Sequence, residues 1–166
     1  MEPTDDLKIP EDILQKLRNP DELRRHIENG DSLQTILGYS DKLMEQMYQA
    51  AKDVFTEKRY SEAQEAFLFL TTLNPYVYAY WLGLAMSYQL IEEYEQAILA
   101  YDCASKVEPE TPLPYYYKAG CHNLLNEIDA AKVVIEQAFE RAKDNPNYEE
   151  LFLKIQHAKS QILKRK

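Results

Sequence analysis

The chain has 166 residues, a formal charge of −9 at pH 7, two cysteines and four glycines. This length can bury one sizeable core, and two cysteines without metal-ligand spacing form no disulfide framework. The negative charge disfavours nucleic-acid binding, which needs clustered Lys and Arg, and a composition rich in Ala, Leu, Glu, Lys and Gln predicts an all-α protein.

Residues 1–40 are predicted to form an amino-terminal helical arm. Its start, MEPTDDLKIPED, lacks the apolar core of a secretion signal, and no run of 18 apolar residues follows, so we expect a cytoplasmic protein without stable membrane insertion. Three short amphipathic segments hold Ile13, Leu14 and Leu17, then Leu23 and Ile27, then Leu33, Ile36 and Leu37. Segments this short are unstable alone. They dock on the rest of the chain, pair with a second copy, or remain mobile.

A period of 34 residues runs through the predicted repeat domain, 41–145. Ala63, Ala97 and Ala131 are 34 apart, and so are Ala51 and Ala85. Such a period is typical of stacked helical hairpins. We predict repeats at 44–77, 78–111 and 112–145, with helix pairs at 44–58 and 61–74, 78–91 and 95–108, and 112–125 and 129–143.

The middle repeat carries the most specific pattern: Trp81, Leu84, Ala85, Tyr88, Ala97, Tyr101, Ala104 and Pro109. This pattern resembles the tetratricopeptide repeat. The resemblance implies three repeats that form a short right-handed superhelix with one concave groove. The third repeat departs from the pattern at Lys118, His122 and Lys143.

Residues 146–166 are predicted to form a capping helix on the third repeat. Pro146 suits the start of a helix, and Leu151, Ile155, Ala158 and Ile162 form one apolar stripe. The basic run 164–166 at its end is interpreted as a complement to the helix dipole.

The first helix of each repeat has a second stripe, which the repeat geometry turns toward the groove. Its members are Tyr48, Lys52 and Phe55, then Leu82, Met86 and Gln89, then Tyr116, Gly120 and Asn123. Apolar members would take side chains of an extended peptide, and Lys52, Gln89 and Asn123 would bind its main chain. In the alternative interpretation these aromatic residues are core, covered by the arm or by a dimer partner.

The stretch 30–145 resembles the class II chaperones of bacterial type III secretion systems. The likeness lies in LGYSDKLMEQMYQAA, RYSEAQEAFLFLTTLNPY, YWLGLAMSYQLIEEYEQAILAY and PYYYKAGCHNLL. It implies a cytoplasmic protein that keeps hydrophobic translocator proteins soluble by holding an extended segment with Pro and Leu anchors in the groove, and a homodimer through the arm. It also implies Tyr60 and Tyr76 as rim contacts. Lys52 departs from the apolar residue expected there, and residues 1–29 are not explained by the family.

The sequence also bears on two other classes of function. A general tetratricopeptide scaffold that joins protein partners is the alternative. Groove positions that hold a partner's terminal carboxylate in other repeat proteins carry Tyr48, Gly83, Leu113 and Tyr117 here, so an acidic-tail ligand is not expected. Catalysis is not expected either, because His26, His122 and His157 lie in different segments and no phosphate-binding glycine loop exists. No catalytic residue, metal or cofactor is predicted.

Overall fold

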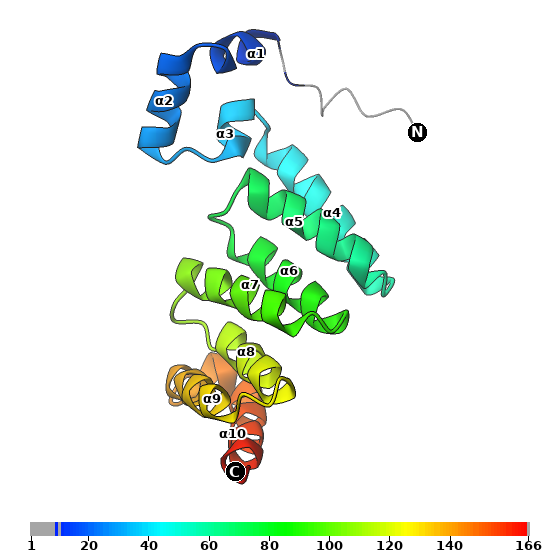
Figure 1. Ribbon diagram of the computed structural model, residues 1–166, viewed down its shortest axis with the longest axis vertical. Helices are drawn as coiled ribbons and strands as arrows, with labels where there is room; N and C mark the ends of the chain where they lie inside the picture. The colour runs from blue at the N-terminus through cyan, green and yellow to red at the C-terminus, as the bar shows by residue number, and fades with distance from the viewer. Residues whose placement is uncertain (1–8, 10, 166) are drawn as a thin grey trace.

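The computed structural model describes residue 9 and residues 11–165, and its helices stack in chain order along one axis (Figure 1). The array consists of α4 (Asp41–Thr56) with α5 (Tyr60–Leu73), α6 (Tyr78–Leu90) with α7 (Tyr94–Val107), and α8 (Leu113–Leu124) with α9 (Ile128–Ala142). All six helices begin and end within three residues of the predicted bounds. The predicted all-α fold, a tetratricopeptide superhelix, is confirmed.

The largest difference from prediction is at the start of α4. Ser40 caps this helix, with its Oγ accepting a hydrogen bond from the Leu43 N–H at 3.2 Å. A serine in this role satisfies one of the free N–H groups of a helix start. The helix therefore begins three residues earlier than its apolar pattern indicates.

The period of 34 also appears in the backbone. Lys58, Glu92 and Asn126 end the first helix of successive repeats with φ of 64°, 64° and 62°. After each of them the chain bonds back onto the helix, as where the Glu93 N–H donates to the Tyr88 carbonyl at 2.9 Å. This left-handed cap is the usual way to end a helix and turn the chain, although glycine generally occupies it.

Small residues lie where the helices cross. Ala63, Ala85, Ala97 and Ala131 have no accessible surface, and their buried neighbours form two core clusters. One cluster joins α4 to α7, and the other joins α8 and α9 to the carboxy-terminal helix. The core is therefore a strip that follows the stack and leaves the groove on one side.

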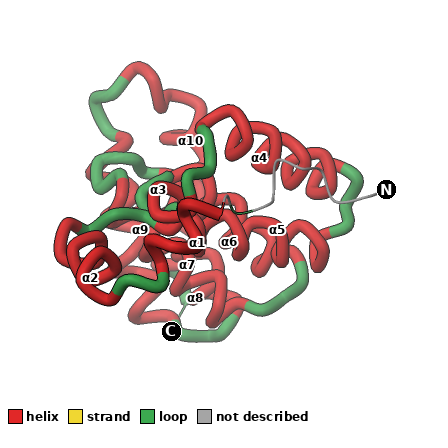
Figure 2. Tube along the Cα trace, turned by 90° about the horizontal axis from the view of Figure 1, so that it is seen from above, coloured by secondary structure: helices red, strands yellow, loops and turns green. Residues whose placement is uncertain are grey.

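The arm consists of α1 (Glu11–Leu17), α2 (Pro20–Asn29) and α3 (Leu33–Leu37) at one end of the stack, which Figure 2 shows from above. In α3, Ile36 is buried, and the Gln34 side chain donates to Asp41 Oδ1 at 2.8 Å while accepting from Asn74 Nδ2 at 2.7 Å. This network docks α3 on the array. In contrast, α2 has no buried residue.

The carboxy-terminal cap starts with a 3-10 turn, η2 (Pro146–Tyr148), and continues as α10 (Glu149–Leu163). Ile155 and Ile162 are buried against the third repeat. Arg165 also has a role that the dipole interpretation did not include, because its guanidinium bonds the side chains of Asn123 and Asn126. Lys166, the other end of the basic run, lies outside the described residues.

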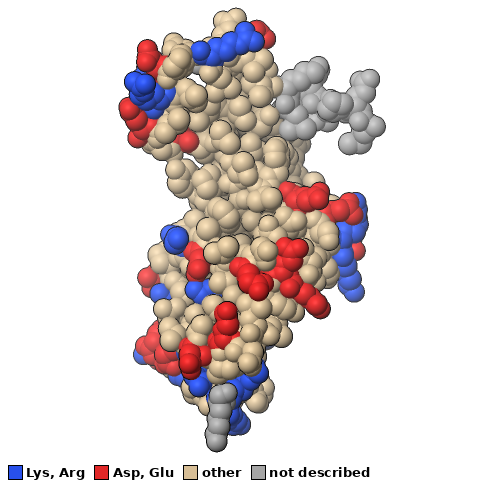
Figure 3. Space-filling model, in the orientation of Figure 1, with Lys and Arg blue, Asp and Glu red and all other residues tan. Residues whose placement is uncertain are grey.

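Charged side chains are unevenly distributed. On the face shown in Figure 3 they gather on the arm, along the right edge and over the lower part of the molecule, with a broad uncharged area below the arm. Within the described part of the chain, no helix combines the length and apolar character that a bilayer crossing requires.

Candidate peptide-binding groove

The groove-facing stripes of α4, α6 and α8 border two cavities. Five of the ten predicted contact residues line the first, namely Tyr48, Lys52, Phe55, Leu82 and Met86. Three more, Gln89, Tyr116 and Asn123, line the second. Met86 and Gln89 are one turn apart on α6, so the cavities are neighbours along the groove. No described residue of the arm lines either cavity.

The first cavity lies between α4 and α6 and has a volume of about 220 Å³. The Tyr48 ring forms one wall, and its centroid is 6.2 Å from the Phe67 ring and 5.4 Å from the Tyr80 ring. Leu82 and Met86 contribute aliphatic surface and are half-buried. The cavity therefore offers apolar surface to a side chain that enters it.

Phe67 and Gly83 shape this cavity. The sequence placed Gly83 at a groove position but did not identify Phe67 as a groove residue. A Cβ atom on Gly83 would lie 2.4 Å from Cε1 of the Phe67 ring, so only glycine allows this ring to pack against α6. Phe67 is 2% exposed and belongs to the buried core, so it is a core residue with one edge on the cavity. A large ring in α5 facing a glycine in α6 is the pattern that could have revealed the contact.

Tyr78 also lines the first cavity and was missed. It precedes Leu82 by one helical turn on the same stripe, which is the signal that could have found it. Its Oη is buried and has no hydrogen-bond partner among the described residues. Burial raises the pKa of this phenol well above its ordinary value, and the charge of Glu108 adds to the effect. The hydroxyl therefore keeps its proton and can donate a hydrogen bond.

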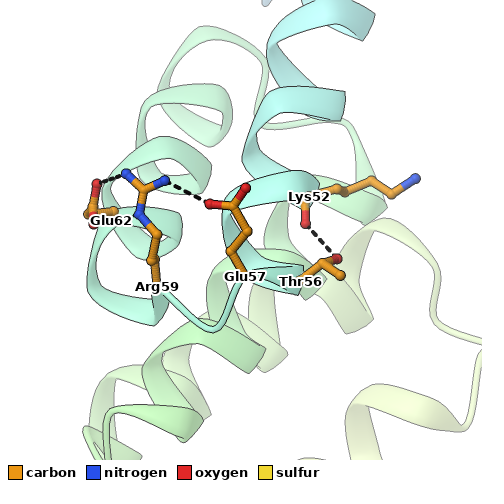
Figure 4. A network of polar contacts seen from close by, with 5 residues as sticks. All are labelled: Lys52, Thr56, Glu57, Arg59 and Glu62. Atoms are coloured by element: carbon orange, nitrogen blue, oxygen red, sulfur yellow. Dashed lines mark hydrogen bonds and ion pairs between the residues drawn. The ribbon is translucent and has the colours of Figure 1, made fainter.

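Lys52 supplies the charge of the first cavity. Figure 4 shows its ammonium group pointing away from the carboxylates of Glu57, after α4, and Glu62, in α5. Those carboxylates are held by Arg59, whose Nη1 lies 2.8 Å from Glu57 and whose Nε lies 2.9 Å from Glu62. The Lys52 ammonium lies 5.3 Å from the Tyr48 ring centroid. Its positive charge therefore borders the aromatic wall.

The second cavity, about 260 Å³, lies between α8 and the capping helix α10. Tyr116 and Tyr117 stand side by side in its wall, with ring centroids 5.2 Å apart. A Cβ on Gly120 would meet no atom within 4 Å, so this glycine borders open space. The contribution of α10 to this cavity was not predicted from the sequence. Ala158, Gln161 and Ile162 of this helix also line the cavity.

Tyr60 and Tyr76 line neither cavity. Tyr60 packs against the groove residue Phe55, with ring centroids 5.3 Å apart. The Tyr76 hydroxyl donates to the Gly30 carbonyl at 2.8 Å, which ties the turn between α5 and α6 to the arm. In this structure Tyr60 supports the groove wall and Tyr76 supports the arm.

Residue types used in catalysis are dispersed. The described residues include no group of His, Cys, Asp and Glu that could hold a metal ion. His122 is half-buried, with its Nδ1 2.6 Å from Glu127 Oε2. Burial raises the pKa of the Cys121 thiol to about 12, so at neutral pH it is protonated and a poor nucleophile.

Comparisons with known proteins agree with this geometry, although no family model matches the chain. Low calcium response locus protein H of Yersinia pseudotuberculosis is 24% identical over 129 residues, 78% of this chain and 77% of that protein. Chaperone protein SicA of Salmonella dublin is 25% identical over 118 residues, 71% of this chain and 72% of that protein. Anaphase-promoting complex subunit CDC16 of Saccharomyces cerevisiae is 32% identical over 88 residues, but these are only 10% of that protein.

Solved structures give the same result. A chain of the CopN–Scc3 complex is 31% identical with a TM-score of 0.75, covering 76% of this chain and 75% of that one. The type III secretion translocator chaperone SycD of Yersinia enterocolitica is 22% identical with a TM-score of 0.74, covering 78% and 97%. PcrH in complex with the chaperone-binding region of PopD is 26% identical with a TM-score of 0.74, covering 76% and 95%.

The stack of helical hairpins and its lined concave face define a tetratricopeptide-repeat protein. Within that class, the chain belongs to the chaperones of type III secretion systems, as its relatives over three quarters of its length show. The family expected from the sequence is confirmed.

Proposed function

We propose that this chaperone binds a hydrophobic translocator protein of its secretion system through an extended segment that lies in the concave groove. The binding keeps the translocator soluble in the bacterial cytoplasm until secretion. The observation that carries the proposal is an apolar groove lining spread over three repeats, which the described residues of the arm do not cover. The structure of PcrH, a relative of similar fold, is of its complex with the chaperone-binding region of PopD.

The two cavities suit apolar anchors of the client. Each buried side chain of the size of leucine contributes about 1.5–3 kcal/mol before ordering costs. Three anchors therefore give a Kd of roughly micromolar for a short peptide. Tighter binding of the whole translocator requires further contacts outside the groove. No chemical step takes part in this function.

Co-expression tests the proposal. We expect the hydrophobic translocator of the same organism to be insoluble alone and to co-purify as a soluble complex with this chain. Limited proteolysis of the complex should leave one protected translocator segment, and a fluorescein-labelled synthetic peptide of that segment should bind with a roughly micromolar Kd. A translocator that stays insoluble beside the folded chaperone would reject the proposal.

A general scaffold is the second candidate, supported by the 32% identity with a stretch of CDC16. A scaffold joins partners that are already folded and soluble. If the protein captured from the native bacterium is soluble without this chain and leaves no protease-protected segment in the groove, the scaffold function replaces the chaperone function.

Homodimerisation through the arm is a further part of the proposal. Leu23 and Ile27 of α2 are 36% and 67% exposed, so this helix has an apolar face available to a second copy. We expect Ile27→Asp to convert a dimer to a monomer in sedimentation experiments. A wild-type protein that is already monomeric at micromolar concentration would reject homodimerisation through the arm.

A further inference from the structure

The polar atoms of the groove share one property. The chain has 28 Asp and Glu residues, yet none of the described residues that line the two cavities is acidic. Apart from tyrosines, the polar side chains there are Lys52, Thr56, Gln89, Asn123 and Gln161. An ammonium group only donates hydrogen bonds, whereas an amide can donate or accept. The hydrogen-bonding character of the groove therefore depends on how its amides are turned.

The orientation of the Gln89 amide is determined by Tyr101. The Tyr101 side chain has no accessible surface, and its hydroxyl lies 2.6 Å from Gln89 Oε1. A buried hydroxyl without an acceptor is costly, so the phenol donates to this oxygen. The amide oxygen of Gln89 is thereby engaged in the core, and its NH2 group is left for the second cavity.

Arg165 determines the orientation of Asn123 by a different contact. Its Nη1 lies 2.5 Å from Asn123 Oδ1 and 3.0 Å from the Asn123 carbonyl, and its Nη2 lies 2.9 Å from Asn126 Oδ1. A guanidinium group has no acceptor, so the oxygen of the Asn123 amide must face it. The NH2 group of Asn123 is therefore the part left for the cavity.

Asn123 and Gln89 occupy the same position in successive repeats, 34 residues apart. Two unrelated partners, one from the core of the second repeat and one from the end of the cap, produce the same result. Both oxygens are engaged, and both NH2 groups remain. In the first cavity, Lys52 supplies a further donor.

We propose that the side-chain NH2 groups of Gln89 and Asn123 donate hydrogen bonds to carbonyl oxygens of the client's main chain. Tyr101 and Arg165 are the positioning residues, because they fix both amides with the NH2 group toward the cavity. The proposal rests on the proposed function and specifies how the groove holds an extended segment. An extended chain in an apolar groove loses the water that its carbonyl groups had bonded, and each one needs a donor in return. Because the described lining has no acidic side chain, it favours the binding of carbonyl oxygens, which carry partial negative charge.

The central test exchanges a donor for an acceptor without changing shape. In Asn123→Asp the new carboxylate keeps Arg165 as its partner, so the melting temperature should stay the same or rise. The labelled translocator peptide should bind about tenfold more weakly, the usual effect of a lost hydrogen bond with an unpaired group. Asn126→Asp is the matched control, because it adds the same charge beside the same arginine but lines neither cavity.

Arg165 is tested by conservative replacement. Arg165→Lys keeps a donor for Asn123 Oδ1 and should retain most of the affinity, whereas Arg165→Met frees the amide and should lower the affinity several-fold. An arginine that only stabilised the end of α10 would show losses that follow the melting temperature instead.

Ester substitution in the peptide identifies the acceptor. Replacing single amides by esters weakens individual carbonyl acceptors, and one or two positions should cost affinity with wild-type protein but not with Asn123→Asp. Equal losses in Asn123→Asp and Asn126→Asp would overturn the proposal, and so would ester effects that persist unchanged in Asn123→Asp. A wild-type protein that does not bind the peptide would overturn the proposed function, and this inference with it.

Discussion

The two cavities are built by neighbouring repeats but differ in what their walls offer. The first is lined by aromatic and aliphatic side chains, and its shape depends on contact between Gly83 and the Phe67 ring. The second contains two amides with fixed orientation, and its glycine, Gly120, borders open space. Apolar contact is non-directional, whereas a hydrogen bond specifies where an atom must lie. The same repeat geometry thus provides a first cavity that contributes affinity and a second cavity that fixes the position of the client chain along the groove.

Removing the apolar wall of the first cavity should have the largest effect. Tyr48→Ala with Leu82→Ala deletes two contact surfaces, each worth about 1.5–3 kcal/mol, so peptide affinity should fall on the order of a hundredfold. Both side chains are only half-buried, so the helical circular dichroism signal should persist and the melting temperature should fall by only a few degrees.

Leu99→Ala is the control for this double variant, because Leu99 on α7 is 66% exposed and lines neither cavity. It should leave affinity unchanged. If the double variant unfolds, Tyr48 and Leu82 belong to the core, and the first cavity is not a binding site for the client.

The two glycines should respond to the same substitution with opposite sign. Gly83→Ala drives a methyl group into the Phe67 ring, and such overpacking costs about 1–3 kcal/mol. Gly120→Ala meets no atom within 4 Å and gains about 0.5–1 kcal/mol from its higher helix propensity. Denaturant titrations of both variants measure the difference. Two losses of equal size would show that Gly120 is constrained as tightly as Gly83.

The sequence was sufficient for the fold because the period of 34 recurs in side chains that meet within each hairpin. Columns such as Ala63 and Ala97 mark helix crossings, and the stripe through Leu82 follows from helical geometry. Contacts between distant segments could not be derived in this way. Arg165 reaches Asn123 across 42 positions of the chain, so the role of the cap in the groove became visible only in three dimensions.

The Tyr78 hydroxyl is buried although its side chain lines the first cavity, and its removal should have a smaller effect. Tyr78→Phe deletes a buried group without a partner among the described residues, so the free protein should be as stable as wild type or slightly more stable. Peptide affinity should stay close to the wild-type value, because a hydroxyl without accessible surface offers no donor to the client.

Tyr101→Phe provides the contrast, because its hydroxyl has a partner at 2.6 Å and its loss should destabilise the free protein. Isothermal titration calorimetry and thermal melts on both variants separate binding from folding. Lower affinity in Tyr78→Phe would show that the hydroxyl becomes accessible to the client on binding.

The turns that close the helices of the groove should show the smallest effect. Glu92 adopts φ of 64° after α6, where a side chain costs about 1 kcal/mol relative to glycine, so Glu92→Gly should raise the melting temperature by a few degrees. Asn126→Gly, after α8, should gain less, because asparagine tolerates this conformation and its side chain accepts a hydrogen bond from Arg165. Equal gains would mean that Arg165 does not depend on Asn126 for its position. The second cavity would then rely on the contact between Arg165 and Asn123 alone, and peptide binding to Asn126→Gly should match the wild type.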